Sequence, residues 1–308
     1  MKKISIVFFG NSAFSVTILN ALVQANFDIR AVITSPDEPK GRGGKPTPPP
    51  TALYAKEHGL PLLQSTQLDK NAVPSCDLGV IASYGHIIPD SILSVPSHGT
   101  LNVHPSLLPH YRGPTPIQTA LANGDTSTGT TIMLTDKEMD HGPIIAQESI
   151  TIDSNDSAIT LEEKLARTSA NLLVDTIPAW IEGRIQARPQ DHANATFTKM
   201  LTKESGHICW DMPARDIINS IRAYKAWPTS WNILDKKNFK IINASISDIP
   251  RAASTVPGTL ITHDGKLYAA ANDFLVHLET IQPSGGKPMA GKAFFAGLRV
   301  DISTLKLL

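Results

Sequence analysis

The first 150 residues alternate short apolar runs with amphipathic segments. Near-continuous apolar, β-branched runs are typical of strands covered on both faces, and four occupy residues 4–10, 29–35, 78–85 and 100–104. Between the first two runs, apolar side chains recur at helical spacing: Phe14, Ile18, Leu19, Leu22 and Val23. This β-α-β rhythm predicts a doubly wound α/β domain with a mostly parallel sheet.

Two further apolar runs follow at close quarters, at residues 129–136 and 142–150. Their short separation predicts an antiparallel addition to the sheet. Residues 157–180 then show the pattern of one long helix. Thr160 and Glu163 stand at capping-box spacing within its opening turns.

After Gly183 the periodicity is lost, and residues 185–206 are interpreted as a linker that follows a catalytic domain of residues 1–184. The remainder, residues 207–308, has a different pattern. A helix is predicted at 213–224, with short strands near 238–246, 258–262, 266–271 and 274–281. Asp264-Gly265 indicates a tight hairpin between two of them. Several short strands with turn signals favour a small β-barrel of the oligonucleotide-binding (OB) type.

The composition is that of an ordinary soluble protein, with 41% hydrophobic and 18% charged residues in 308. No run approaches the roughly 20 apolar residues of a membrane helix, and the apolar start is better interpreted as a buried strand than as a signal peptide. Cys76 and Cys209 lie far apart without metal-ligand spacing, which predicts two buried, inert thiols, no disulfide and no metal site. The expected compartment is the reducing cytoplasm.

The net charge of zero conceals an asymmetry. Residues 1–206 hold 16 Lys and Arg against 20 Asp and Glu, a balance of −4, whereas residues 207–308 hold 12 against 8, a balance of +4. A mildly basic C-terminal third has the sign that an anionic partner prefers.

The end of the fourth apolar run presents candidate chemistry. In open α/β sheets, ligands bind beyond the carboxyl ends of the parallel strands. Asn102 and His104 are two residues apart at such an end, so their side chains point the same way. A neutral imidazole can accept a proton from an amine, and an amide N–H can stabilise an oxyanion. The alternative is structural: Asn102 caps a turn and His104 is a satisfied, half-buried side chain.

Two neighbouring features favour the catalytic interpretation. Asp140 lies in a glycine-bounded loop from which its carboxylate could orient an imidazole and stabilise its protonated form, although such an Asp commonly only makes a turn. Directly after His104, two leucines stand between prolines and predict a stiff apolar ledge. That ledge could flank a flat ring system, or it could be loop packing.

Residues 102–134, "NVHPSLLPHYRGPTPIQTALANGDTSTGTTIML", and the later "DKEMDHGPII" closely resemble the folate-dependent formyltransferases. The resemblance implies a Rossmann-like catalytic domain with an appended β-barrel, and 10-formyltetrahydrofolate as the formyl donor. It implies Asn102, His104 and Asp140 as the catalytic set, with no metal. It also implies that folate is contacted by Ser106, Leu107, Leu108 and Pro109.

Residues 207–231, 257–260 and 282–297 resemble the second domain of those members that formylate initiator methionyl-tRNA for translation initiation. The resemblance therefore covers almost the whole chain and implies a tRNA-binding C-terminal domain; a monomer is expected. In those members a basic, glycine-rich insertion reaches the acceptor stem. Here the corresponding cations are Lys40, Arg42 and Lys45. The alternative for this segment is a solvated loop without a partner.

Two other functions stay open from the sequence. An amino-sugar formyltransferase shares the catalytic residues and can also have a C-terminal barrel, but it has no need of a basic insertion. A nucleic-acid-binding module on a decayed enzyme scaffold has no reason to keep all three residues together. The sequence also departs from the family pattern at His86, His110 and His141, which leaves the fine shape of the folate loop open.

Overall fold

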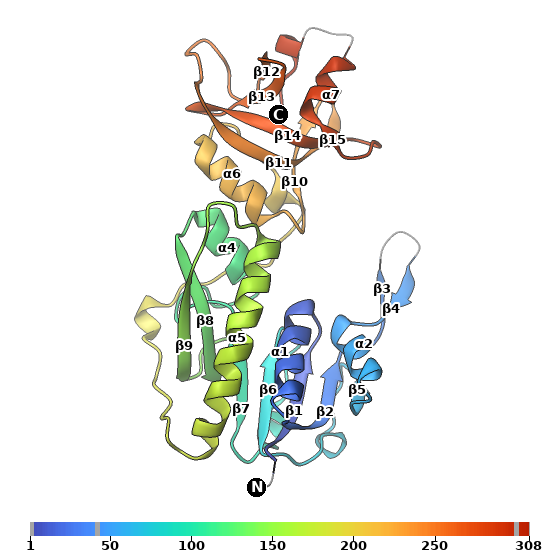
Figure 1. Ribbon diagram of the computed structural model, residues 1–308, viewed down its shortest axis with the longest axis vertical. Coiled ribbons are helices and arrows are strands. Elements are labelled where there is room, and N and C mark those ends of the chain that lie inside the picture. Colours follow the sequence, from blue (N-terminus) through green and yellow to red (C-terminus); the bar gives the residue numbers. More distant parts are fainter. Residues whose placement is uncertain (1–2, 41–43, 299–301, 308) are drawn as a thin grey trace. The chain divides into compact units, whose positions relative to one another are not determined.

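The protein is described by a computed structural model over residues 3–40, 44–298 and 302–307 (Figure 1). The chain forms two compact units. The first contains Met1–Pro116, Ser127–Thr151 and Glu162–Lys199, and the second contains Ile117–Thr126, Ile152–Leu161 and Met200–Leu308. Two short segments that interrupt the first unit in the sequence therefore belong to the second unit.

The first unit is built on a seven-stranded sheet in the order β5-β2-β1-β6-β7-β8-β9. The first five strands in this order are parallel, and β8 and β9 are antiparallel additions. Both features confirm the prediction from the apolar pattern. The strands are β1 (Ser5–Gly10), β2 (Asp28–Thr34), β5 (Leu62–Gln64), β6 (Leu78–Ala82), β7 (Thr100–His104), β8 (Ser127–Leu134) and β9 (Ile144–Thr151).

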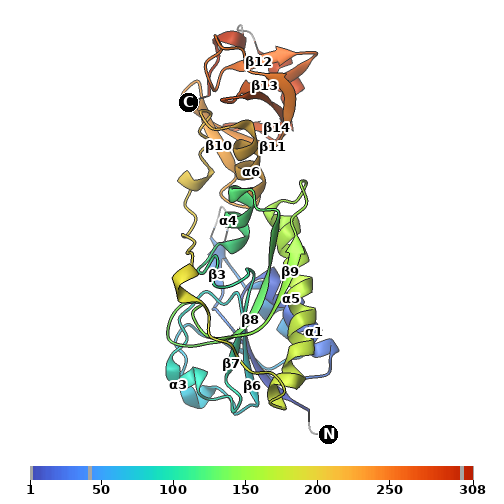
Figure 2. The same ribbon diagram turned by 90° about the vertical axis from the view of Figure 1, so that its left-hand side faces the viewer.

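Helices cover both faces of this sheet, with α1 and α5 on one face and α3 on the other (Figures 1 and 2). Apolar side chains of β1 are consequently buried on both sides; Ile6, Val7, Phe8 and Phe9 are at most 1% exposed. The helices and helical turns before residue 200 are α1 (Ala13–Gln24), α2 (Pro50–Glu57), η1 (Lys70–Ala72), α3 (Asp90–Leu93), α4 (Pro116–Asn123), α5 (Ala158–Ile181) and η2 (His192–Asn194).

The long helix is where the pattern predicted it, but its cap differs. The Ser157 amide donates to Thr160 Oγ1 at 3.0 Å, and the Thr160 amide donates to Ser157 Oγ at 3.4 Å. The reciprocal pair of the capping box is therefore Ser157 with Thr160, one turn before the predicted pair of Thr160 with Glu163.

A separate two-stranded hairpin pairs β3 (Glu38–Lys40) with β4 (Lys45–Thr47). The register places Lys40 opposite Lys45. Two of the three cations predicted to reach tRNA are thus neighbours across one hairpin, and Lys45 is exposed. Arg42 lies outside the described residues.

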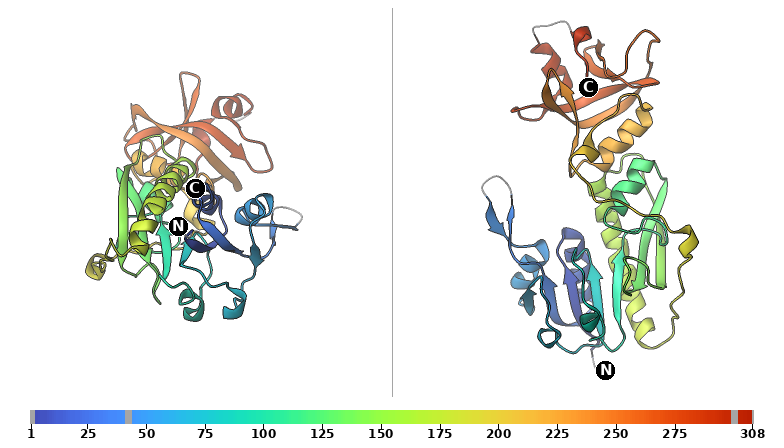
Figure 3. Two further views of the ribbon diagram at one scale, coloured as in Figure 1. Left: turned by 60° about the horizontal axis from the view of Figure 1, so that its bottom comes forward. Right: turned by 180° about the vertical axis from the view of Figure 1, so that it is seen from behind.

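The second unit contains an antiparallel sheet in the order β10-β11-β14-β13-β12, with β15 paired to β14 (Figure 3). The segment near the C-terminus joins the two ends of this sheet through bridges Leu234↔Leu307 and Thr259↔Lys306. This closure confirms the predicted barrel. Its elements are η3 (Glu204–Gly206), α6 (Ala214–Ala223), β10 (Ser230–Leu234), β11 (Lys237–Pro250), β12 (Leu260–His263), β13 (Lys266–Ala270), β14 (Phe274–Pro283), β15 (Met289–Ala290), α7 (Gly291–Ala296) and η4 (Ile302–Thr304).

The predicted hairpin at Asp264-Gly265 joins β12 to β13, and both residues have positive φ, +47° and +68°. Positive φ at both central positions is the geometry of a type I′ turn, which suits glycine at the second position. Several short strands were not predicted, namely β3, β4, β5, β10 and β15, and the exposed Cys209 contradicts the expectation of two buried thiols. No helix among the described residues is long and apolar enough to cross a membrane.

Candidate active site

Strand β7 presents Asn102 and His104 on one face of the sheet, as the period of two requires. Asn102 is paired in register with Ile81 of β6 and Met133 of β8, and His104 is paired with Thr131 of β8. Asn102 is half-buried, whereas His104 is only 5% exposed. Both side chains therefore stand on rigid backbone.

Asp140 reaches the same face by a less direct route. Because β8 runs antiparallel to β7, the loop of residues 135–143 leaves β8 beside the amino end of β7 and folds back. Its ends are held by Thr135 N donating to Thr100 O at 2.8 Å and by Leu134 N donating to Pro143 O at 2.9 Å. Asp140 itself has φ +51°, in the left-handed region.

The side chains of Asn102 and His104 both approach the carboxylate of Asp140, the third predicted residue. Asn102 Nδ2 donates to Asp140 Oδ1 at 3.1 Å, and His104 Nδ1 lies 3.5 Å from the same oxygen. The other oxygen, Oδ2, accepts from Gly113 N at 2.7 Å. The structure thus brings together a carboxamide, an imidazole and a carboxylate from two segments that are separated in the sequence.

The hydrogen bonds of His104 determine where its protons lie. Nε2 is 2.9 Å from Tyr111 O, and a carbonyl only accepts, so Nε2 carries a hydrogen. Nδ1 then faces Asp140 Oδ1 either as the N–H of an imidazolium or as a bare acceptor. A proton on Nδ1 would pair the imidazolium with this carboxylate.

The predicted folate-contacting stretch follows directly. Ser106 and Leu108 turn inward: Ser106 is fully buried with its hydroxyl donating to His110 O at 2.6 Å, and Leu108 packs with Met133 and Ile144. Leu107 and Pro109 stay half-buried. The stretch is therefore a stiff ledge of the predicted kind, with two of its four side chains partly open to solvent.

The departures from the family pattern have separate surroundings. His86 Nε2 lies 2.8 Å from Ser35 Oγ, and His110 is exposed. His141 Nδ1 lies 2.7 Å from Asp136 Oδ2, and its ring stacks on His192 at 4.0 Å between centroids. His141 therefore braces the loop that holds Asp140.

Two buried polar residues at this site were missed from the sequence. Arg112 is 4% exposed and Gln190 is 5% exposed, and they are bonded to each other. Arg112 lies within the stretch that resembles the formyltransferases, but no function was predicted for it. Gln190 lies in the segment that was interpreted only as a linker. A Gln in an aperiodic segment gives no pattern by which it could have been found.

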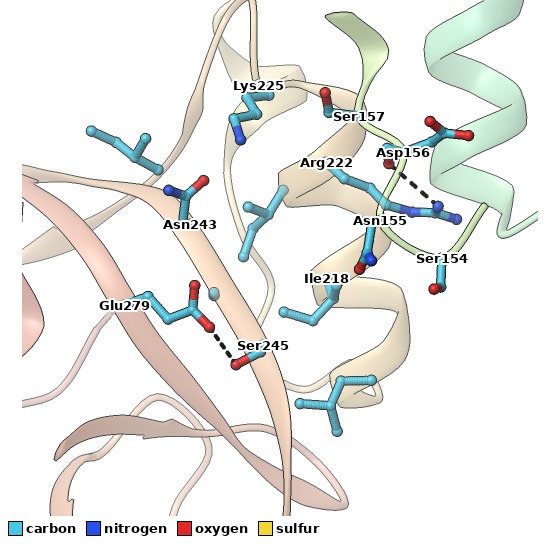
Figure 4. Close-up of a pocket in the computed structure, with 14 residues that line it drawn as sticks. Ser154, Asn155, Asp156, Ser157, Ile218, Arg222, Lys225, Asn243, Ser245 and Glu279 are labelled. Carbon is cyan, nitrogen blue, oxygen red and sulfur yellow. Dashed lines mark hydrogen bonds between the residues drawn. The ribbon is translucent and has the colours of Figure 1, made fainter. Parts of the chain in front are cut away.

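A cavity of about 370 Å³ lies within the second unit (Figure 4). Its charged lining includes Arg222, which donates to Asp153 O at 3.2 Å, and Glu279, which accepts from Ser245 Oγ at 2.7 Å. Burial lowers the pKa of Arg222, although nearby Asp156 opposes this change. The cavity is lined neither by Asn102, His104 and Asp140 nor by residues 106–109.

Comparison with known families matches residues 2–177 to the formyl transferase family and residues 200–299 to the formyl transferase C-terminal domain. The chain therefore belongs to the formyl transferase family, as its Rossmann-like unit and appended barrel indicate. It is 42% identical over 305 residues to a methionyl-tRNA formyltransferase of Chloroflexus aurantiacus, covering 96% of this chain and 97% of that protein. It is 39% identical over 305 residues to a methionyl-tRNA formyltransferase of Listeria innocua, covering 97% of each.

Solved structures share the fold at lower identity. An N-formyltransferase from Helicobacter canadensis in complex with folinic acid and dTDP-3-aminofucose aligns with a TM-score of 0.68 at 18% identity, covering 90% of this chain and 99% of that chain. HypX from Aquifex aeolicus in complex with tetrahydrofolic acid aligns with a TM-score of 0.68 at 15% identity, covering 96% and 47%. At these identities the likeness concerns the fold alone.

Proposed function

We propose that this formyltransferase transfers the formyl group of 10-formyltetrahydrofolate to the free amino group of methionine on initiator methionyl-tRNA. The observation that supports the proposal most is the convergence of Asn102 and His104 on Asp140 Oδ1. Its tRNA half is supported by the methionyl-tRNA formyltransferases to which the chain is similar along nearly its whole length.

The ledge after His104 has properties that suit a reduced folate. Its backbone is fixed, because Leu108 N donates to Thr131 Oγ1 at 3.1 Å and Leu108 O accepts from Gln147 Nε2 at 2.9 Å. Leu107 and Pro109 leave apolar surface partly open for a flat ring system. In this proposal these two side chains contact the folate directly, and the buried Ser106 and Leu108 hold the ledge in place.

Asn102 would stabilise the oxyanion that forms when the methionine amine attacks the formyl carbon. One N–H of its amide is bonded to Asp140, and the other has no acceptor among the described residues. A preorganised donor aimed at a developing negative charge needs no reorganisation during the reaction. The amide is therefore oriented by Asp140 and left with one N–H for the substrate oxygen.

His104 and Asp140 would manage the protons. The attacking amine must lose a proton, and N10 of the folate must gain one as its bond to the formyl carbon breaks. The pair is suited to this exchange because Nδ1 and Oδ1 face each other at 3.5 Å, so that a proton received by the imidazole is stabilised by the carboxylate. It can take up the amine proton and return a proton to N10, directly or through water.

Replacing Asn102 or His104 tests the proposal. Loss of an oxyanion-hole donor typically costs about 2.7–4 kcal/mol of barrier, and a general acid–base residue typically contributes about 10²–10⁴-fold in rate. Asn102→Ala and His104→Ala should therefore each lower kcat roughly 100-fold or more. The measurement is formyl transfer from 10-formyltetrahydrofolate to methionyl-tRNA. His58→Ala, an exposed histidine after α2, is the matched control and should keep wild-type turnover. Near-normal turnover by a folded His104→Ala enzyme would overturn the assignment.

The remaining assignments concern the partner and the setting. Lys40, Arg42 and Lys45 are proposed to contact phosphates of the tRNA, and the C-terminal domain of residues 207–308, with its balance of +4, to bind the same anion. The reaction is placed in the cytoplasm, where translation begins. A monomer suffices, because Asn102, His104 and Asp140 all come from one chain.

A further inference from the structure

Asp140 is held from behind by a side chain outside the proposed catalytic set. Gln190 Nε2 lies 2.9 Å from Asp140 O and 2.7 Å from Gly142 O, so one amide group donates to two carbonyls of the loop. Gln190 is 5% exposed. These bonds hold the backbone of Asp140, whose carboxylate faces His104. They therefore fix the backbone position from which this side chain extends.

Arg112 in turn fixes Gln190. Its Nε and Nη2 donate to Gln190 Oε1 at 3.1 and 2.6 Å, and Nη2 also lies 2.9 Å from His192 Nδ1. Because the guanidinium occupies the only oxygen of the carboxamide, the amide cannot flip without leaving donors face to face. Gln190 is therefore locked with its N–H groups toward the Asp140 loop.

The segment around Gln190 is bonded to both loops of the site. Ile144 N donates to Arg188 O at 2.7 Å just after the Asp140 loop, and Thr198 N donates to Arg112 O at 2.7 Å just before Gly113. Gly113 N is itself a donor to Asp140 Oδ2. The chain that follows α5 thus joins the two loops from which the carboxylate takes its position.

We propose that Gln190, locked by Arg112, is a positioning residue for formyl transfer that sets the distance between Asp140 and His104. The inference rests on the proposed function of these two residues. The physical reason is that the loop folds back over the sheet with Asp140 at φ +51°, and a displacement of the order of 1 Å at a reacting group can lower the rate about 100-fold.

Gln190→Glu tests this role while keeping the acceptor for Arg112. The variant loses the N–H donors and places carboxylate oxygen against two carbonyls, whereas the buried guanidinium stays paired. We expect kcat for formylation of methionyl-tRNA to fall about tenfold or more, with both KM values within about twofold. Trp180→Phe is the control: it removes one donor to a backbone carbonyl, His98 O, elsewhere in the same unit and should leave kcat unchanged.

Coupling separates positioning from general destabilisation. If Gln190 acts through Asp140, adding Gln190→Glu to Asp140→Ala should slow the enzyme less than about twofold further, whereas independent effects would multiply. The nitrogen NMR signals of the His104 ring, measured without substrates, should also move in Gln190→Glu in the same direction as in Asp140→Ala. Unmoved His104 signals, or multiplied rate losses, would overturn the inference. Failure of the wild-type enzyme to formylate methionyl-tRNA would instead overturn the proposed function.

Discussion

Asp140 is the residue whose backbone conformation matters most at the site. An L-residue at φ +51° is uncommon, but Asp and Asn tolerate this region better than most residues. The conformation turns the carboxylate toward Asn102 and His104, while Gly113 N holds its far oxygen. Gln190 Nε2 in addition donates to the backbone carbonyl of Asp140, so the position and orientation of this one side chain depend on contacts from three different segments.

The sequence predicted part of this arrangement and missed part for definite reasons. That Asn102 and His104 share a face follows from the period of a strand. That Asp140 lies beside them does not, because a loop that folds back has no period; here the family resemblance supplied the prediction. Gln190 had no signal at all, since it acts through hydrogen bonds in an aperiodic segment.

The two cysteines give a prediction at the same scale. Cys76 is 8% exposed, and burial raises the pKa of its thiol to about 11, whereas Cys209 is exposed. At a pH far below its pKa a thiol is protonated and is a poor nucleophile. At pH 8 an alkylating reagent should modify Cys209 in the folded protein and leave Cys76 until the protein is unfolded. Equal labelling of both thiols in the native state, followed by mass spectrometry, would contradict this.

Strand β7 shows how an element prepares a site. It is parallel to β6 on one side and antiparallel to β8 on the other, so it lies inside the sheet and Asn102 and His104 have little freedom. The apolar runs predicted such buried strands well. The strand β10 was missed, because its alternating burial gives only a short and weak apolar pattern.

The segment that contains β3 and β4 is predicted to contribute to tRNA binding. If Lys40, Arg42 and Lys45 bind phosphates, changing all three to Gln should weaken tRNA binding and flatten its dependence on salt. The logarithmic slope should fall by about one for each phosphate that is no longer neutralised. Binding of 10-formyltetrahydrofolate should not change, and it serves as the internal control. An unchanged slope for tRNA binding would contradict this proposal and favour the alternative, in which the segment is solvated and has no partner.

For the whole molecule, the sequence predicted a parallel sheet followed by a barrel, and both are present. Closure of the barrel through Leu307 and Lys306 depends on pairing between distant segments, which no local pattern reveals. The same holds for Ile117–Thr126 and Ile152–Leu161, which belong to the second compact unit although they precede the last segment of the first unit, Glu162–Lys199. Local periodicity specifies elements, and long-range contacts decide how they are grouped.

The choice of acceptor tests the proposed function most directly. The wild-type protein would be mixed with 10-formyltetrahydrofolate and either methionyl-tRNA or a nucleotide-linked amino sugar, and release of tetrahydrofolate would be followed. The proposal predicts rapid release with methionyl-tRNA, formylmethionine on the tRNA, and only background release with the sugar. Rapid turnover with the amino sugar and none with methionyl-tRNA would contradict it.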